Sequence, residues 1–133
     1  MNNYSECRRV PIKGKGGFFM LKKVNVLGTE YSISYESDEK VAADMCGFPG
    51  EFGGYCDGYS KKIVIANGNA CNDTELTKNE RKRESLRHEI VHAFLNESGL
   101  KANSNWAQNE ELVDWIAIQS PKIFKLFEKL EVL

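Results

Sequence analysis

The chain has 133 residues, the size of one ordinary domain, and its 41% hydrophobic and 28% charged residues are typical of a soluble globular protein. It contains no run of about 18 apolar residues, so we expect no membrane span. Its net charge of −1 gives no electrostatic reason to expect nucleic acid as the main partner.

Residues 1–19 carry scattered charge, three glycines and no hydrophobic periodicity, so we interpret them as a flexible leader. A single folded domain is predicted over residues 20–133. The leader has no apolar core of signal-peptide length, which predicts a cytoplasmic protein. In that reducing compartment the four cysteines of the chain are expected to be free thiols.

The first regular elements are predicted to be a β-hairpin and a short helix. Residues 24–27 and 31–35 alternate in character on either side of a Gly-Thr pair, which is a hairpin pattern. Residues 37–46 follow as a short helix, with Ser37 or Asp38 as its N-cap.

A glycine-rich segment, residues 47–54, is predicted to be a loop. Residues 55–57 and 63–66 then favour two more short strands, separated by a turn that contains a glycine. Residues 67–73 form another connection rich in turn residues.

After this connection the hydrophobic period becomes that of helices. Thr77 and Glu80 fit a capping box at the start of a long helix. This helix is predicted to end near Ser98, where Gly99 supplies a left-handed stop. A second helix is predicted over residues 105–119.

Ser120 and Pro121 fit an N-cap and first-turn pair, which predicts a third, amphipathic helix. Its apolar residues are Ile123, Phe124, Leu126, Phe127 and Leu130. Strands followed by helices predict an α+β fold, in which a small, mostly antiparallel sheet packs on the long helix and on the helix that follows it.

The long predicted helix contains an HExxH motif, since residues 88–92 read HEIVH. His88 and His92 project from one face of a helix, so both imidazoles can bind one zinc ion at about 2.0–2.1 Å. Glu89 lies about 100° around the helix and flanks the metal, where it can take a proton from water and deliver it to a leaving amine. The chain has no other histidines, which argues against a chance match. The alternative is an ordinary pair of surface or core histidines.

A catalytic zinc ion needs a third protein ligand and one open position. We expect the third ligand on the next helix, where Glu110 and Asp114 share one face. Glu110 would bind the metal, and Asp114 would accept the outer ring N–H of a ligand histidine. Glu111 points about 100° away and is the weaker candidate. All three acids could instead complement the dipole at the start of the helix.

HEIVH followed by NEELVD, residues 109–114, resembles the gluzincin pattern of thermolysin-like peptidases, which have NExxxD on the helix after HExxH. The small size is more similar to the ImmA/IrrE type, metallopeptidases of bacteria, their phages and mobile elements. Their second helix carries Glu-x-x-x-Asn/Asp-x-x-Ala, which Glu110, Asp114 and Ala117 match. The resemblance covers about residues 21–120. It implies a minimal zincin-like fold and zinc-dependent hydrolysis of a cytoplasmic protein, such as a phage or mobile-element regulator.

Two positions depart from this family pattern without removing a ligand: Val91 stands where glycine is usual, and Asp114 where asparagine is frequent. No histidine is left to stabilise a tetrahedral intermediate, so Tyr55, Tyr59 or a backbone amide would have to contact the transition state or the substrate. Residues 63–66 could form an edge strand that binds substrate by strand addition, as zinc peptidases of this architecture commonly do, or an ordinary strand of the sheet.

A different hypothesis is a non-catalytic zinc-binding domain that acts by protein–protein interaction. Structural zinc sites are normally closed by four protein ligands, and Cys71 or Cys56 would supply the fourth. A third, weaker hypothesis is a nucleic-acid adaptor that uses the basic leader and residues 81–87.

Overall fold

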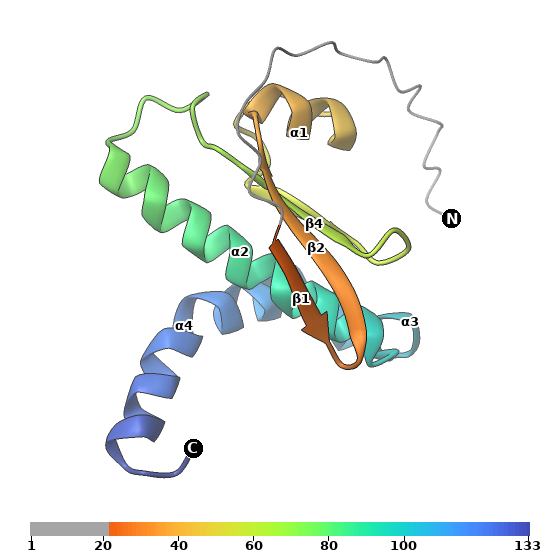
Figure 1. The fold of residues 1–133 in the computed structure, drawn as a ribbon, viewed down its shortest axis with the longest axis vertical. Helices are drawn as coiled ribbons and strands as arrows, with labels where there is room; N and C mark the ends of the chain where they lie inside the picture. The colour runs from red at the N-terminus through yellow and green to blue at the C-terminus, as the bar shows by residue number, and fades with distance from the viewer. Residues whose placement is uncertain (1–21) are drawn as a thin grey trace.

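The computed structural model describes residues 22–133, which form a four-stranded sheet with helices on both faces (Figure 1). The predicted leader, residues 1–19, lies outside the described residues. The elements in chain order are β1 (Lys22–Val26), β2 (Thr29–Glu36), α1 (Asp38–Met45), β3 (Gly54–Asp57), β4 (Lys62–Ala66), α2 (Glu75–Glu97), α3 (Leu100–Asn103), the 3-10 helix η1 (Asn105–Gln108) and α4 (Glu110–Lys129).

The strands lie in the order β1-β2-β4-β3. The outer pairs, β1 with β2 and β3 with β4, are antiparallel, and the central pair of β2 with β4 is parallel. The predicted α+β class and the mostly antiparallel sheet are therefore confirmed.

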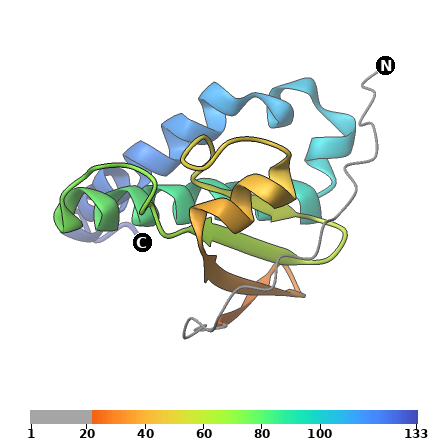
Figure 2. The ribbon, with the colours of Figure 1, turned by 90° about the horizontal axis from the view of Figure 1, so that it is seen from above.

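Strand β4 lies in the middle of the fold and is buried on both faces. Ile63 and Ile65 pack on the side of α2, whereas Val64 and Ala66 pack on the side of α1. The sheet is thus covered by α2 on one face and by α1 on the other (Figure 1, Figure 2). Of the two alternatives for residues 63–66, the structure supports the ordinary strand of the sheet and contradicts the edge strand, because β4 has a hydrogen-bonded neighbour on each side and the edges are β1 and β3.

Helix α1 begins as the sequence suggests, with Ser37 as its N-cap: the side chain accepts the Lys40 N–H at 3.2 Å. The other candidate, Asp38, is buried and accepts the N–H groups of Gly68 (3.0 Å) and Ala70 (2.8 Å). Asp38 therefore ties the connection before α2 to α1.

Two of the cysteines are free thiols, as predicted, namely Cys56 and Cys71. Cys46, the C-cap of α1, is disulfide-bonded. The prediction of four free thiols is therefore wrong at Cys46.

Helix α2 starts one turn earlier than the capping box predicts. Thr74 is the N-cap, and its hydroxyl accepts the Thr77 N–H at 3.2 Å, so Thr77 already lies inside the helix. The predicted end is confirmed, since Ser98 is the C-cap and Gly99 has a left-handed φ of 77°.

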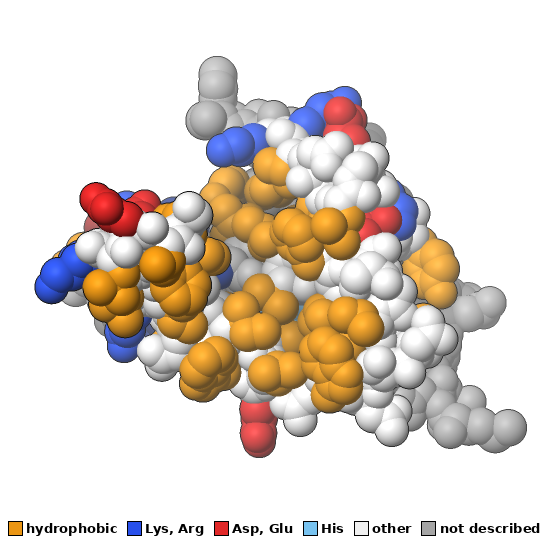
Figure 3. Space-filling view, turned by 90° about the horizontal axis from the view of Figure 1, so that it is seen from below, with side chains coloured by type: hydrophobic (Ala, Val, Ile, Leu, Met, Phe, Trp, Pro, Cys, Tyr) orange, Lys and Arg blue, Asp and Glu red, His pale blue; other side chains and the backbone are white. Residues whose placement is uncertain are grey.

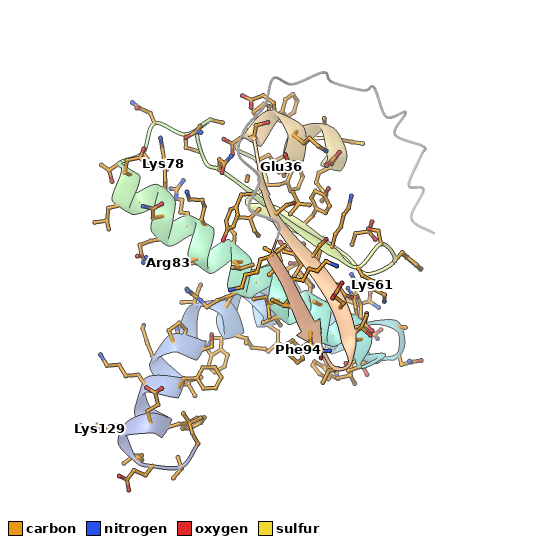
Figure 4. The ribbon with its side chains drawn as sticks, in the orientation of Figure 1. Glu36, Lys61, Lys78, Arg83, Phe94 and Lys129 are labelled. Atoms are coloured by element: carbon orange, nitrogen blue, oxygen red, sulfur yellow. The ribbon has the colours of Figure 1, made fainter. Side chains whose placement is uncertain are left out.

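The C-terminal end of α2 is tied to the sheet through Glu97. The carboxylate accepts hydrogen bonds from Thr29 Oγ1 (2.9 Å) and from the Tyr31 hydroxyl (2.7 Å). It also pairs with Lys61, which lies beyond β3 near this end of the helix (Figure 4). The bond from Lys61 first, then those from Tyr31 and Thr29, lower the pKa of Glu97 from 4.5 to about 2. Glu97 is therefore an ionised anchor between helix and sheet.

We expect Glu97→Gln to lower the melting temperature at neutral pH. Because the folded pKa lies below the unfolded one, this carboxylate stabilises the fold fully above about pH 4.5, and the contribution is lost as the pH falls toward about 2. Thermal unfolding of both proteins over this range should show a difference in melting temperature that shrinks in acid. Glu30→Gln, which breaks only an exposed pair with Lys23, is the control. A difference that stays constant with pH would contradict the anchor.

The two helices predicted after residue 105 have different bounds in the structure. Residues 105–108 form η1, and α4 begins after Asn109, whose side chain accepts the Leu112 N–H at 2.8 Å. Helix α4 then continues through Ser120 and Pro121, so the predicted break at this pair is wrong.

The C-terminal half of α4 extends away from the sheet (Figure 1), and its large apolar side chains are exposed. They include Phe124, Leu126, Phe127 and Leu130. Seen from below, this side of the molecule carries many apolar side chains (Figure 3). None of the helices within residues 22–133 is long and apolar enough to cross a membrane.

Candidate metal centre

An open cleft of about 1900 Å³ runs along β3, one of the two edges of the sheet. Strand β3 lines it over its whole length, with α1 contributing on one side and α2, α3 and the start of α4 on the other. The side chains of the HExxH motif and of the acidic segment meet in this cleft: His88, Glu89, His92, Glu110 and Asp114.

The helical period of α2 separates the side chains that pack from those that face the cleft. Leu86, Ile90 and Ala93 lie on one stripe and pack against the sheet. His88 and His92, four residues apart, project from a different side and line the cleft. Packing of the apolar stripe therefore fixes the direction in which the two imidazoles point.

Helix α4 brings the acidic residues to the histidines. Val113 of α4 is fully buried and packs with Leu95 of α2 and Ala107 of η1. The first turns of α4 therefore lie beside α2 (Figure 2). Glu110 and Asp114 lie one turn apart on α4 and both reach the motif.

Three ligand atoms converge in the cleft. His88 Nε2 lies 3.0 Å from His92 Nε2 and 3.1 Å from Glu110 Oε2, and His92 Nε2 lies 3.3 Å from Glu110 Oε2. A tetrahedral ion about 2.0–2.1 Å from each ligand would hold the ligand atoms roughly 3.3 Å apart. The triangle therefore has nearly the size that a metal ion requires, and the group could hold one.

The protonation of the histidines also fits a metal ion. Asp114 Oδ1 lies 2.7 Å from His88 Nδ1, and because a carboxylate accepts hydrogen bonds this contact favours the tautomer with its proton on Nδ1 and a lone pair on Nε2. Burial lowers the pKa of His92, which favours its neutral form, and its Nδ1 is buried without a hydrogen-bond partner. A proton on His92 Nε2 could form a hydrogen bond to only one of the other two atoms of the triangle. A metal cation could instead accept lone pairs from all three atoms.

Glu89 is buried beside the cluster, with 7% of its surface exposed. Burial, partly offset by the nearby His88, raises the pKa of Glu89 from 4.5 to about 7. A carboxyl group with such a pKa can both accept and release a proton near neutral pH. The position suits the general base that the motif predicts.

The two tyrosines predicted as substrate or transition-state contacts both line the cleft. The Tyr55 hydroxyl donates a hydrogen bond to Asp44 Oδ2 at 2.7 Å. Burial, and then this hydrogen bond, raise the pKa of Tyr55. Tyr59 lies fully exposed between β3 and β4. A contact of either tyrosine with substrate stays a prediction.

Sequence reasoning missed Lys101, an exposed residue of α3 that lines the cleft. Its positive charge opposes the rise that burial causes in the pKa of Glu89, and it adds to the fall that burial causes in the pKa of His92. A single lysine in an unpredicted four-residue helix carries no sequence signal, so only the fold could reveal it.

The cysteines that a closed zinc site would need lie outside the cluster. Within residues 22–133 the metal-binding group consists of His88, His92 and Glu110. Cys56 lines the same cleft, but burial raises the pKa of its thiol to about 12, which disfavours the thiolate that binds metals.

Comparisons with protein-family models, curated proteins and solved structures give no match for this chain. The resemblance to small metallopeptidases therefore stays a prediction from the motifs, and the site is interpreted from its own geometry.

Proposed function

We propose that the chain is a zinc-dependent metallopeptidase that hydrolyses peptide bonds of a cytoplasmic protein. The observation that carries the proposal is the convergence of His88 Nε2, His92 Nε2 and Glu110 Oε2 on one point of an open cleft. Two histidines and one glutamate are a ligand set of catalytic zinc sites, which leave one position open.

Each residue of the site then has a defined role. His88, His92 and Glu110 would hold the ion, while Asp114 keeps His88 in the tautomer that presents Nε2. Zinc would supply Lewis acidity toward water and the peptide carbonyl. Glu89 would accept the proton of the attacking water and deliver it to the leaving amine.

The edge of the sheet supports a peptide as the substrate. Strand β3 pairs with β4 on one side only, and it lines the cleft over its whole length. An extended peptide could add to this edge through backbone hydrogen bonds, which would bring it alongside the metal centre. The motif resemblance suggests a regulator of a phage or mobile element as the protein cleaved.

During peptide hydrolysis negative charge would develop on the carbonyl oxygen of the substrate, and a group besides the zinc ion would have to stabilise it. Tyr55 and Tyr59 are the candidates from the sequence, and Lys101 is a third, because it lines the same cleft.

The alternative, a non-catalytic zinc domain that binds a protein partner, has one observation in its favour. The exposed apolar side chains of α4 form a surface that a partner could cover (Figure 3). The metal site itself favours catalysis, since the cluster in the described part of the chain offers three ligands and no cysteine.

Zinc content and peptide hydrolysis test the proposal together. We expect about one zinc ion per chain, cleavage of a random peptide library, loss of cleavage with a chelator and recovery when zinc is added back. Zinc without any cleavage of the library would favour the non-catalytic domain. Protein that takes up no zinc would contradict both functions.

A further inference from the structure

A proline in the middle of α4 leaves one backbone carbonyl of that helix without its usual donor. Pro121 has no N–H, so the carbonyl of Ala117, four residues earlier, lacks the hydrogen bond that the residue at this position normally donates in a helix. Ala117 is 1% exposed, and a buried acceptor without a partner is destabilising. A donor from outside α4 must satisfy this carbonyl.

Arg87 of α2 supplies that donor. Its Nε–H donates to the carbonyl oxygen of Ala117, and the two atoms lie 2.6 Å apart. The other two arginines of α2, Arg81 and Arg83, pair with carboxylates instead. The guanidinium of Arg87 is thus directed at the backbone of the helix that carries the acidic ligand.

This bond lies next to the contacts of the metal centre. Arg87 precedes His88, whose Nδ1 lies 2.7 Å from Asp114 Oδ1, and Asp114 is one turn before Ala117. Glu110 lies one turn further back, so these three residues of α4 share one face. Two consecutive residues of α2 therefore contact successive turns of α4, the helix that carries Glu110.

We propose that Pro121 and Arg87 are positioning residues of the metal centre. The proline frees the Ala117 carbonyl, and Arg87 uses that carbonyl to hold α4 where Glu110 faces the histidines. Neither residue touches the metal or the substrate. The inference rests on the proposed zinc site and is independent of peptidase activity.

Arg87→Met tests the bond directly, since it removes the donor and keeps an unbranched apolar side chain. We expect zinc to bind about 10-fold more weakly, as for other residues that orient ligands, and Arg87→Lys to recover only part of the affinity. Competition of the full chain with a chromogenic chelator measures the dissociation constant. Arg83→Met is the matched control on the same helix (Figure 4) and should leave it unchanged.

Pro121→Ala separates positioning from a purely structural role. Alanine restores the helical N–H, so the metal-free protein should melt at a higher temperature. The Ala117 carbonyl then bonds within its own helix, and zinc affinity should fall. If Pro121 affected only the stability of the fold, its replacement by alanine would raise the melting temperature and the zinc affinity together. Wild-type affinity in Arg87→Met and Pro121→Ala would overturn the inference and leave the zinc site standing, whereas a wild-type protein without zinc would overturn both.

Discussion

Replacing Glu89 by glutamine is expected to abolish peptide hydrolysis while zinc stays bound. The amide has the shape of the carboxyl group but cannot accept a proton, and general acid–base catalysis contributes about 10²–10⁴-fold to such reactions. Glu89 is not one of the three residues that converge on the metal position, so the ligand set is intact in this variant. Because Glu89 is buried, a neutral amide should not destabilise the fold.

The measurement pairs the cleavage rate on a peptide library with the zinc content of the same preparation. Glu84→Gln is the matched control, because Glu84 lies one turn before His88 on α2 and lines the same cleft, but is exposed. It should retain both zinc and activity. Loss of zinc in Glu89→Gln would make Glu89 a ligand or a structural residue, and full activity would remove it from the mechanism.

The features that were predictable from the sequence depend on local spacing. Two histidines four residues apart share a helix face whatever surrounds the helix, and the same holds for Glu110 and Asp114. The end of α2 was predictable because Gly99 adopts a left-handed conformation that few other residues favour.

The wrong predictions concern features that depend on distant contacts. Pro121 is a good start for a new helix by local rules, but Arg87, 34 positions earlier in the printed sequence, satisfies the carbonyl that the proline leaves free. The position of β4 in the sheet is set by pairing with β2 and β3. The unbroken apolar run at residues 63–66 is a signal for a strand buried on both faces, and it favours the ordinary strand over the edge strand, the two alternatives left open by the sequence.

Substituting Glu110 or its neighbour Glu111 tests which of them is the third ligand, and the two variants should differ strongly in zinc affinity. Glu110→Gln is expected to weaken zinc binding by at least about 100-fold, the upper end of the loss caused by residues that merely orient ligands. The reason is geometric: Glu110 Oε2 lies 3.1 Å and 3.3 Å from the two histidine nitrogens, so its charge faces the position that the ion would occupy. Glu111 is exposed and points about 100° around the helix.

Glu111→Gln is a control for the alternative that these acids only complement the helix dipole. Both residues lie in the first turn of α4, so either substitution removes one favourable charge from the same helix end. A dipole effect would lower the melting temperature of the two metal-free variants similarly and leave zinc binding nearly equal. A ligand role makes the two dissociation constants differ by two orders of magnitude. Equal constants would contradict Glu110 as a ligand, and a larger loss in Glu111→Gln would transfer the role to Glu111. Since the two substitutions are chemically identical and adjacent, any difference in zinc affinity reports which carboxylate faces the histidines.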